Sequence, residues 1–436
     1  MIDVLVAIYE DGGEAYLRPL TLTRPAYALR CGASLIYEKV LASVEGQFIF
    51  YVRGSLLDVA REKLGGVGEV RALSDVRTLD RGEDLLLING RWLFDRDLLE
   101  LEEGVAVKNG EPTYAFIRRR SIDAILRGCG SIIEALEKAG RELGEREVAE
   151  AKLVRYPWDL VRYNRLELER DLEVLRRLKQ WDEPRGEGVY MVGDREDIMV
   201  SGSARIYPCV VLDSTQGPII VDDDAVIFPH SYIAGPCYIG RGSWIVGGRI
   251  SSSSIGPMCR VGGEVEETIF QGFSNKYHAG FVGHSYVGEW VNLGALTTTS
   301  DLKNDYSVVR APAAGKLVDT GMIKVGTFIG DHTKTSIGSL LSTGSVIGIM
   351  CNLVTSGEPY PKYIPSFTWY IRGRVWDWIT IDQMMEAAER MMARRGAVMS
   401  EAEKRLYRDL YDETREERGR FAESLLTGRR GLCAKS

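Results

Sequence analysis

The sequence lacks the features that mark secreted, membrane-spanning and zinc-binding proteins. Its seven cysteines are scattered and form no CxxC pair, so neither a disulfide framework nor a zinc site is indicated. No stretch reaches the ~18 uninterrupted apolar residues that a membrane-spanning helix needs. The first residues, MIDVLVAIYED, have no basic segment before their short apolar run, which argues against a signal peptide. We therefore expect a cytoplasmic protein in a reducing compartment, with no membrane partner.

The sequence also lacks an excess of positive charge. Its net charge is -7, and a general nucleic-acid-binding protein usually carries a basic face, so we expect no nucleic-acid partner. This balance still allows a local basic pocket for a phosphorylated small molecule. A length of 436 residues predicts two or three domains, and 45% hydrophobic residues suffice for ordinary cores.

The first region, residues 1–195, mixes short apolar runs with helical patterns. Apolar runs at 4–8, 48–52 and 85–88 predict strands, and helical periodicity is present at 121–143 and 166–181. Strands that alternate with helices indicate an α/β domain with a mixed or parallel sheet. Residues 182–193 are rich in Glu, Arg, Gly and Pro and are interpreted as a linker.

The second region, residues 196–370, carries aliphatic residues at steps of six. The first run is Val221, Ile227, Ile233, Ile239 and Ile245. The second is Ile323, Ile329, Thr335, Leu341, Ile347 and Leu353, and Ile255, Val261, Phe281, Val287 and Leu293 lie between the two runs. A step of six fits neither a helix nor an alternating strand. It fits a triangular coil in which one small side chain per face points inward.

We therefore predict a left-handed parallel β-helix over residues 221–353. The alternative, a β-sandwich with chance spacing, is disfavoured by five consecutive matches followed by a second, nearly complete set. Isolated coils expose flat faces and tend to trimerise, so we expect a homotrimer.

The third region, residues 371–436, is predicted to be a helical tail. Residues 384–397 and 400–425 have helical periodicity, dense charge and no proline. Ser400 and Glu403 have the spacing of a capping box. The apolar face of the tail must pack either on the coil or on a neighbouring subunit, and its methionines are interpreted as core.

Three arginines after the first predicted strand are candidates for phosphate binding. Arg18, Arg24 and Arg30 lie among turn-forming Pro and Gly residues. Guanidinium groups donate in pairs and suit phosphate oxygens, and a loop after the first strand of a parallel sheet is where α/β folds bind ligands. The alternative is three solvated surface arginines.

All four histidines lie in the repeat region, which suggests chemistry there. They are His230, His278, His284 and His332. The six-residue register loosens between about 264 and 292, around His278, and a break in a repeat marks side chains that do something other than stack.

The first region resembles sugar-1-phosphate nucleotidyltransferases. The segment LRPLTLTRP resembles the loop after their glycine-rich signature, Asn89-Gly90 resembles their metal-binding turn, and PWDL resembles the end of their catalytic domain. The resemblance implies Mg²⁺, and Asp159 of PWDL is the one ligand we name. Two departures argue against catalysis, because Ala26 stands where the family has lysine and Arg91 where it has aspartate. Arginine cannot hold Mg²⁺.

The repeat region resembles the acetyltransferase half of the bifunctional UDP-N-acetylglucosamine pyrophosphorylase/glucosamine-1-phosphate N-acetyltransferase family. The segments GGEV, SNKYHAGFVG, GEWVNLGA and DLKN carry the resemblance. By resemblance His278 is the general base for acetyl transfer from acetyl-CoA, Glu264 is the carboxylate that orients it, and Asn292 is an amide that contacts the amino sugar. An imidazole has a pKa that suits this proton transfer.

The coil also departs from the family. Glu266 replaces a lysine that grips the sugar phosphate, and Phe281 replaces a tyrosine. The missing positive charge could come from one of four residues, Lys276, Lys303, Arg249 or Arg260. The acetyl acceptor could therefore be glucosamine 1-phosphate, another amino sugar or a nucleotide sugar.

Our leading hypothesis is a transferase with two activities. The first is uridylyl or thymidylyl transfer to a sugar 1-phosphate, and the second is amino-sugar N-acetylation. Its partners would be a sugar phosphate, a nucleoside triphosphate and acetyl-CoA. Two alternatives stay open: a non-catalytic trimeric scaffold that binds nucleotide sugars, and an enzyme in which only the coil is active.

Overall fold

The computed structural model describes residues 4–76, 83–182 and 187–427. The chain divides into two compact units. The first, here the sheet unit, comprises Met1–Leu17, Thr23–Leu29 and Ser34–Arg155. The second, here the coil unit, comprises Arg18–Leu22, Arg30–Ala33 and Tyr156–Ser436. Six cysteines in the described part are free, and Cys433 lies outside it.

The sheet unit is built on a seven-stranded mixed sheet in the order β5-β4-β1-β6-β8-β7-β9. The bounds are β1 (Val4–Tyr9), β4 (Gln47–Val52), β5 (Glu69–Ala72), β6 (Asp84–Asn89), β7 (Gly104–Lys108), β8 (Glu111–Ile117) and β9 (Glu145–Glu147). Strands β5, β4, β1 and β6 are mutually parallel, and β8 is antiparallel to both neighbours. Every residue of β1 is buried, as expected for a parallel strand that is covered on both faces.

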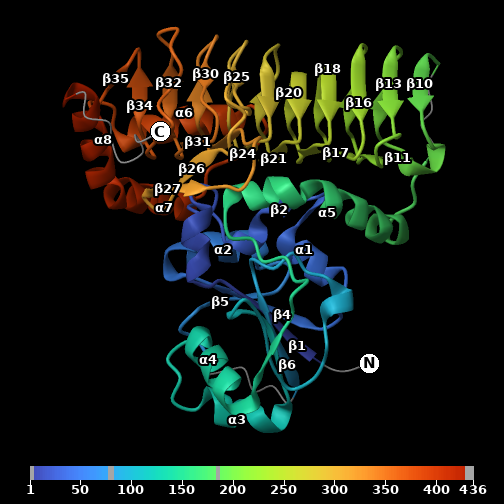
Figure 1. The fold of residues 1–436 in the computed structure, drawn as a ribbon, viewed down its shortest axis with the longest axis vertical. Helices are drawn as coiled ribbons and strands as arrows, with labels where there is room; N and C mark the ends of the chain where they lie inside the picture. The colour runs from blue at the N-terminus through green and yellow to red at the C-terminus, as the bar shows by residue number, and fades with distance from the viewer. Residues whose placement is uncertain (1–3, 77–82, 183–186, 428–436) are drawn as a thin grey trace. The chain divides into compact units, whose positions relative to one another are not determined.

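Within the described residues, four α-helices belong to the sheet unit (Figure 1). They are α1 (Ile36–Leu41), α2 (Leu57–Leu64), α3 (Arg119–Leu126) and α4 (Ile132–Leu143). The helical pattern at 121–143 is therefore two helices, because Gly128 and Gly130 interrupt it and Ser131 caps α4 by accepting the N–H of Glu134.

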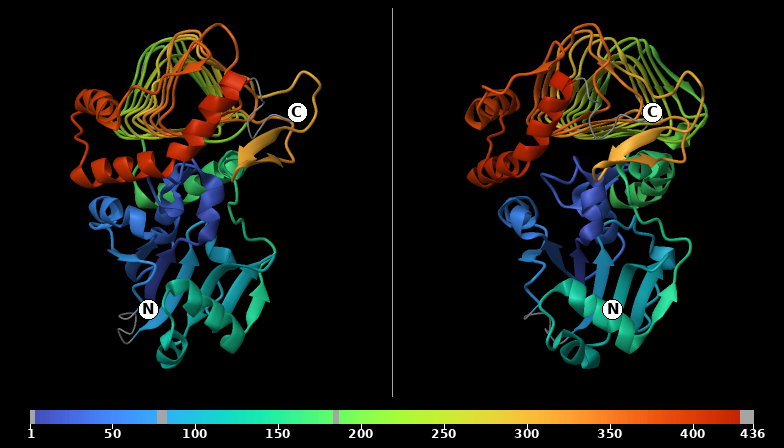
Figure 2. Two further views of the ribbon diagram at one scale, coloured as in Figure 1. Left: turned by 90° about the vertical axis from the view of Figure 1, so that its left-hand side faces the viewer. Right: turned by 60° about the vertical axis from the view of Figure 1, so that its left-hand side comes forward.

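The coil unit is a parallel β-helix with a triangular cross-section (Figure 2). One face is a nine-stranded parallel sheet. Its strands are β11 (Ile198–Val200), β14 (Ile219–Val221), β17 (Cys237–Ile239), β19 (Ser254–Ile255), β21 (Ile269–Gly272), β24 (Tyr286–Glu289), β28 (Thr327–Ile329), β31 (Ser345–Ile347) and β33 (Tyr363–Ile364).

The other strands described form the rest of the coil. They are β10 (Val189–Val192), β12 (Arg205–Ile206), β13 (Val210–Asp213), β15 (Val226–Ile227), β16 (Ser231–Ala234), β18 (Trp244–Ser251), β20 (Arg260–Glu266), β22 (Asn275–Lys276), β23 (Phe281–Gly283), β25 (Thr298–Thr299), β29 (Lys334–Thr335), β30 (Leu340–Leu341), β32 (Asn352–Val354), β34 (Trp369–Ile371) and β35 (Arg374–Val375). An antiparallel hairpin, β26 (Arg310–Ala313) and β27 (Lys316–Asp319), leaves the coil between β25 and β28.

The residues predicted to stack inside the coil are buried, with two exceptions. Ile323 is 53% exposed because it follows the hairpin and lies outside the repeat. Phe281 is half-buried, and its neighbour Val282 takes the inward position, paired with Val265. Each fully buried aliphatic side chain contributes about 1.5–3 kcal/mol, so the stack is the main source of stability of this unit.

The repeat also extends further than predicted at its N-terminal end. Strand β10 pairs with β13 inside the coil, so the prediction of a linker over 182–193 is wrong for this part of the segment. Residues 183–186 of that segment lie outside the described residues.

Four helices accompany the coil. Helix α5 (Pro157–Leu178) buries Leu168 and Leu172 against outward-facing residues of the nine-stranded sheet. The tail forms α6 (Ile381–Ala393), α7 (Glu401–Glu413) and α8 (Arg415–Thr427). Ser400 and Glu403 form the predicted capping box of α7.

The tail packs on its own coil, which settles one of the two alternatives left open by the sequence. The Tyr407 ring lies 5.6 Å from that of His332, and the Tyr411 ring lies 5.4 Å from that of Phe367. Buried methionines of α6 fill the core, as predicted. The predicted fold class, an α/β unit followed by a β-helix and a helical tail, is confirmed. None of the described helices is long and apolar enough to cross a membrane.

Candidate functional site

A column of polar and aromatic side chains runs along one face of the coil. Neighbouring turns pair Trp244 with Arg260, Arg260 with Asn275, Asn275 with Asn292, and Asn292 with Lys334. These residues alternate along their strands with the inward stack, so their side chains face outward. The repeat thus places one functional side chain per turn at nearly constant spacing.

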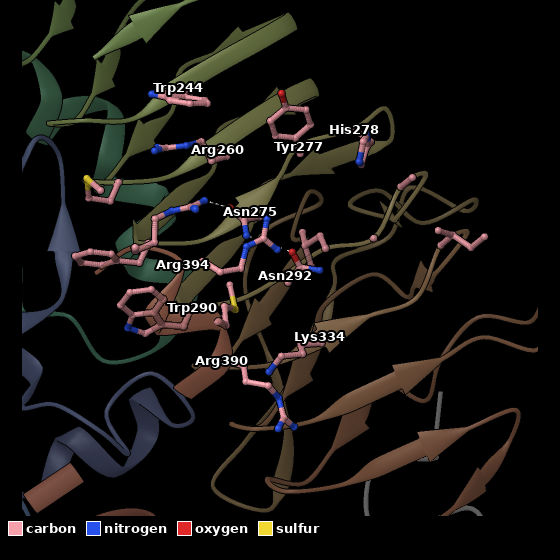
Figure 3. Close-up of a pocket in the computed structure, with 18 residues that line it drawn as sticks. Trp244, Arg260, Asn275, Tyr277, His278, Trp290, Asn292, Lys334, Arg390 and Arg394 are labelled. Atoms are coloured by element: carbon pink, nitrogen blue, oxygen red, sulfur yellow. Dashed lines mark hydrogen bonds between the residues drawn. The ribbon is translucent and has the colours of Figure 1, made fainter. Parts of the chain in front are cut away.

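The column borders a cavity of about 1030 Å³, and residues at the C-terminal end of α6, among them Arg390 and Arg394, also line it (Figure 3). Five cations contribute to its lining: Arg260, Lys334, Arg390, Arg394 and Arg395. Four aromatic side chains, Trp244, Phe273, Tyr277 and Trp290, also line it. No carboxylate is among the described residues that line the cavity, which is notable in a chain with a net charge of -7.

Most of these cations have only neutral partners. Arg260 donates to the carbonyls of Gly242 and Cys259 and lies over the Trp244 ring, 4.0 Å from its centroid. Arg395 Nη2 donates to Asn275 Oδ1 at 2.9 Å, and its Nε is buried without a hydrogen-bond partner. Arg390 is paired with a carboxylate, Glu386, at 3.6 Å.

Two of these side chains have lowered pKa values, which shows that the arrangement disfavours their charged forms. Burial, together with the charge of Arg395, lowers the pKa of Arg260 to about 10. Burial lowers the pKa of Lys334 to about 8, and its Nζ donates to the carbonyl of His332 at 3.1 Å. Cations brought together without counter-charges favour an anionic ligand, because the ligand would supply the missing charge.

His278 and Asn292 both line this cavity, so two of the three residues predicted for catalysis share one site. Asn292 Oδ1 accepts from Asn275 Nδ2 at 3.3 Å. His278 lies at one edge of the cavity, exposed, with its ring 5.2 Å from that of Tyr277 (Figure 3). Among the described residues, no carboxylate hydrogen-bonds to its imidazole.

The third predicted catalytic residue, Glu264, does not line the cavity. Glu264 is exposed and pairs in register with Arg249 and Phe281. The orienting role predicted for its carboxylate therefore has no hydrogen bond to support it. Lys303 also lies outside the cavity lining, in a loop where its amine is 3.6 Å from Asp305.

Lys276, predicted to bind substrate, points into the coil instead. It pairs with Val261 in the inward stack and is only 2% exposed. Its Nζ donates to the carbonyls of Gly262 at 2.8 Å and His278 at 3.0 Å. Burial lowers its pKa to about 8. Lys276 thus tethers the backbone that carries His278.

Of the other three histidines, two are buried against neighbouring side chains and the third is exposed. His284 is buried between two carboxylates, with Nδ1 2.8 Å from Asp301 and Nε2 3.2 Å from Glu267. His332 stacks on Trp290, at 6.2 Å between ring centroids, and is buried. His230 is exposed.

The three arginines of the N-terminal loop have different surroundings. Arg18 is exposed and pairs with Glu413 of α7 at 3.2 Å. Arg30, in the short strand β2 (Arg30–Cys31), is buried and lies over the Tyr238 ring of the coil at 5.5 Å. Arg24 is buried and belongs to the sheet unit. A shared phosphate-binding role for all three stays a prediction.

The Asn89-Gly90 turn lies at the carboxyl end of β6 and is wholly internal. Asn89 is 1% exposed and donates to Asp11 Oδ2 and to the carbonyl of Pro112, at 2.8 Å each. A Cβ at Gly90 would collide with the Tyr27 ring. Arg91 follows the turn and fills the space beside Asp11, where it is 3% exposed.

Asp159 lies in the first turn of α5 and closes a capping box. Its Oδ2 accepts the N–H of Tyr156 at 2.8 Å. In residues 4–76, 83–182 and 187–427, no group of three or more His, Cys, Asp or Glu side chains is arranged to hold a metal ion. The role of Asp159 as a Mg²⁺ ligand stays a prediction.

The most informative part of the cavity was not predicted from the sequence. Arg390, Arg394 and Arg395 come from the segment RMMARRG in the tail, which we interpreted as part of a packing helix. The cluster of three arginines around the end of that helix was the available signal. The sequence gave no such signal for Lys334, because this lysine follows the coil pattern of outward polar residues.

Comparisons with known proteins agree with the organisation described above. A family model described as sugar nucleotidyl transferase matches residues 6–180. A relative from Sulfurisphaera tokodaii, named bifunctional sugar-1-phosphate nucleotidylyltransferase/acetyltransferase, is 34% identical over 144 residues, covering 30% of this chain and 34% of the relative. Bifunctional protein GlmU of Wigglesworthia glossinidia brevipalpis is 29% identical over 137 residues, covering 30% and 26% respectively. The chain thus spans about a third or less of the length of each.

Among solved structures, the inositol-1-phosphate CTP transferase from T. maritima aligns with 36% of this chain and 91% of its own, at 14% identity and a TM-score of 0.28. The family model and the two relatives support the resemblance seen in the sequence. Residues 6–180 of the chain are thus similar to the sugar nucleotidyl transferase family, and the chain is similar to relatives named as bifunctional nucleotidylyltransferase/acetyltransferase and GlmU.

Proposed function

We propose that the coil unit transfers an acetyl group from acetyl-CoA to the amine of a phosphorylated amino sugar. The observation that carries this proposal is that His278 and Asn292 line the same cavity as five cations, with no carboxylate among the described lining residues. Both substrates carry phosphate groups, and paired guanidinium donors suit phosphate oxygens. The aromatic side chains offer a stacking surface for an adenine ring.

The proposed reaction needs one base and no metal. The amine nitrogen attacks the thioester carbonyl, an N–C bond forms and the C–S bond breaks. His278 takes the proton that the nitrogen loses, and the departing thiolate is protonated to give free coenzyme A. Asn292 would hold the sugar, and Lys276 would position the backbone of His278 through its bond to that carbonyl.

Of the hypotheses that the sequence left open, this proposal favours an enzyme in which only the coil unit is active. The relatives are named for two activities, and nucleotidyl transfer to a sugar 1-phosphate would belong to residues 6–180. Arg91, however, stands beside Asp11 where a metal ligand was expected. We therefore assign nucleotide-sugar binding rather than nucleotidyl transfer to that domain.

The test follows release of the coenzyme A thiol with glucosamine 1-phosphate as acceptor. General-base catalysis contributes about 10²–10⁴-fold, so His278→Asn should lose activity by about that factor. His230→Asn is the matched control, because His230 is an exposed histidine of the same coil. Equal activity of His278→Asn and the unmodified protein, or no thiol release above background with several amino sugars, would refute the proposal.

The proposal also includes a cytoplasmic homotrimer. Size-exclusion chromatography with multi-angle light scattering of the full chain tests the assembly, because a trimer of this 48.6 kDa chain has three times the mass of the monomer. A particle of one chain at micromolar concentration would contradict it.

A further inference from the structure

The Arg91 guanidinium is enclosed by oxygen atoms at the carboxyl end of strands β1 and β6. Its Nη2 lies 2.6 Å from Asp11 Oδ2 and 2.8 Å from Glu111 Oε2. Its Nε donates to Asp11 Oδ1 at 2.7 Å, and its Nη1 donates to the carbonyl of Val154 at 2.9 Å. Two carboxylates and a carbonyl thus accept from one buried guanidinium, and the other oxygen of Glu111 forms an ion pair with Arg155.

The surrounding chain is shaped around this side chain. A Cβ at Gly13 would collide with the guanidinium carbon of Arg91, so the glycine makes room for it. Asn89 accepts the Arg91 backbone N–H at 2.9 Å and donates to Asp11 at 2.8 Å, which fixes both partners. Gly13 therefore serves the arginine.

The carboxylate that directly precedes Asp11 in the sequence is also paired with an arginine. Glu10 is 1% exposed, forms an ion pair with Arg53, and accepts the backbone N–H of Ala26 at 3.2 Å. Both acidic residues after β1 are therefore committed to arginines of the same unit. This edge of a parallel sheet is where α/β folds bind ligands, and here its charges are internally compensated.

The oxygen atoms around Arg91 are of the kind that Mg²⁺ or Mn²⁺ prefers. A divalent ion and the guanidinium cannot occupy the same space, and their charges repel each other. The residues present therefore do not fit a divalent cation.

We propose that the Arg91 guanidinium is the resident cation of the sheet unit and replaces the divalent metal that its family resemblance implies. It follows that this unit binds its ligands without a divalent ion and that Arg91 is what excludes one. Arg91→Asp should open an oxygen site formed by Asp11, Glu111, Asn89 and the new carboxylate. This inference does not depend on acetyl transfer by the coil unit.

Mn²⁺ binding to the full chain tests the inference directly. Electron paramagnetic resonance measures the free ion in a titration of the unmodified protein and of Arg91→Asp. We expect at least tenfold tighter Mn²⁺ binding by the variant. Binding of one ion by the unmodified protein with a Kd below about 1 mM, lost in Glu111→Gln, would overturn the proposal.

Thermal unfolding provides a readout that does not depend on the strength of the signal from bound ion. Arg91→Asp should be destabilised without metal and regain melting temperature as Mn²⁺ is added, because a ligand that binds only the folded state stabilises it. Arg91→Lys keeps the positive charge and should show no such response. If Arg91→Asp shows no Mn²⁺-dependent rise, the guanidinium does not stand in for a metal. If Arg91→Asp is unfolded, refolding on addition of Mn²⁺ is the expected result and its absence overturns the proposal.

Discussion

The two units each gather arginines around one place, but they treat the charges in opposite ways. At the carboxyl edge of the sheet, Arg91 and Arg53 have carboxylate partners within the same unit. In the coil cavity, Arg260 and Arg395 donate only to carbonyl and amide oxygens among the described residues. A cation with an internal counter-charge stabilises the fold, whereas one without it offers that charge to a ligand. The comparison therefore separates structural arginines from binding arginines.

The largest expected effect is on stability at the paired edge. Asp11→Ala leaves the buried Arg91 with one carboxylate and should destabilise the sheet unit by about 3 kcal/mol, or roughly 10 °C in melting temperature. Arg394→Ala in the coil cavity should change stability by less than about 0.5 kcal/mol. Differential scanning calorimetry of the full chain measures both. Equal losses of stability in the two variants would contradict the proposed difference between the paired arginines of the sheet unit and the arginines of the coil cavity.

A paired cation inside the coil unit should stabilise it in a pH-dependent way. Although burial opposes protonation, the hydrogen bonds to Asp301 and Glu267 raise the pKa of His284 to about 9. Because the folded-state pKa lies above the usual 6.5, the stabilisation is present below pH 6.5 and is lost as pH rises through 9.

The difference in unfolding free energy between the unmodified protein and His284→Asn should therefore shrink, by on the order of 3 kcal/mol, between pH 6 and pH 10. Urea denaturation at several pH values measures it. His230→Asn is the control and should show no such trend. A constant difference in unfolding free energy across this range would show that His284, between Asp301 and Glu267, is not protonated in the folded protein.

Removal of unpaired cations should weaken anion binding and leave the fold intact. Each of Arg394→Gln and Arg395→Gln should lower coenzyme A affinity about tenfold, because a charge-assisted hydrogen bond contributes about 1.5–3 kcal/mol. Isothermal titration calorimetry gives the affinities, and Arg420→Gln, on α8 outside the cavity lining, is the control. Similar losses in all three variants would point to a general charge effect.

The smallest effect is expected at the buried Lys276, whose amine donates to two backbone carbonyls. Burial depresses its pKa to about 8, so the charged amine opposes folding below that pH, and this penalty is relieved as pH rises from 8 to 10.5. Lys276→Met should remove this rise and be neutral or about 1 kcal/mol more stable at pH 7. It should also lower kcat of acetyl transfer, because the tether to the His278 carbonyl is lost. An unchanged kcat would make Lys276 a packing residue only.

The fold could be predicted because it follows from periodic patterns of residues that are close together in the sequence. The steps of six located the coil, and the alternation of apolar runs with helical patterns located the α/β unit. The six-residue register does loosen before His278, because the pairs Ile250–Val265, Ile255–Phe270 and Val261–Lys276 are closer in sequence than three steps of six. The inward stack nevertheless continues through this region, and Lys276 takes one of its positions.

The candidate site could be predicted only in part. His278 and Asn292 follow from the resemblance, and they do share one cavity. The arginines that complete the cavity come from a helix more than 100 positions later in the chain than Asn275, to which Arg395 donates. No spacing rule connects residues that far apart.

The sequence by itself determined the coil, the mixed sheet, the tail and the histidine at the edge of the cavity, because repeats, strand patterns and motifs are local. Only the tertiary structure decided which arginines serve as ligand-binding groups and which are internal counter-ions. Arg91 and Arg395 are chemically identical in the sequence. One lies against Asp11 and Glu111, and the other against an asparagine amide beside a cavity, and that difference in surroundings sets their roles.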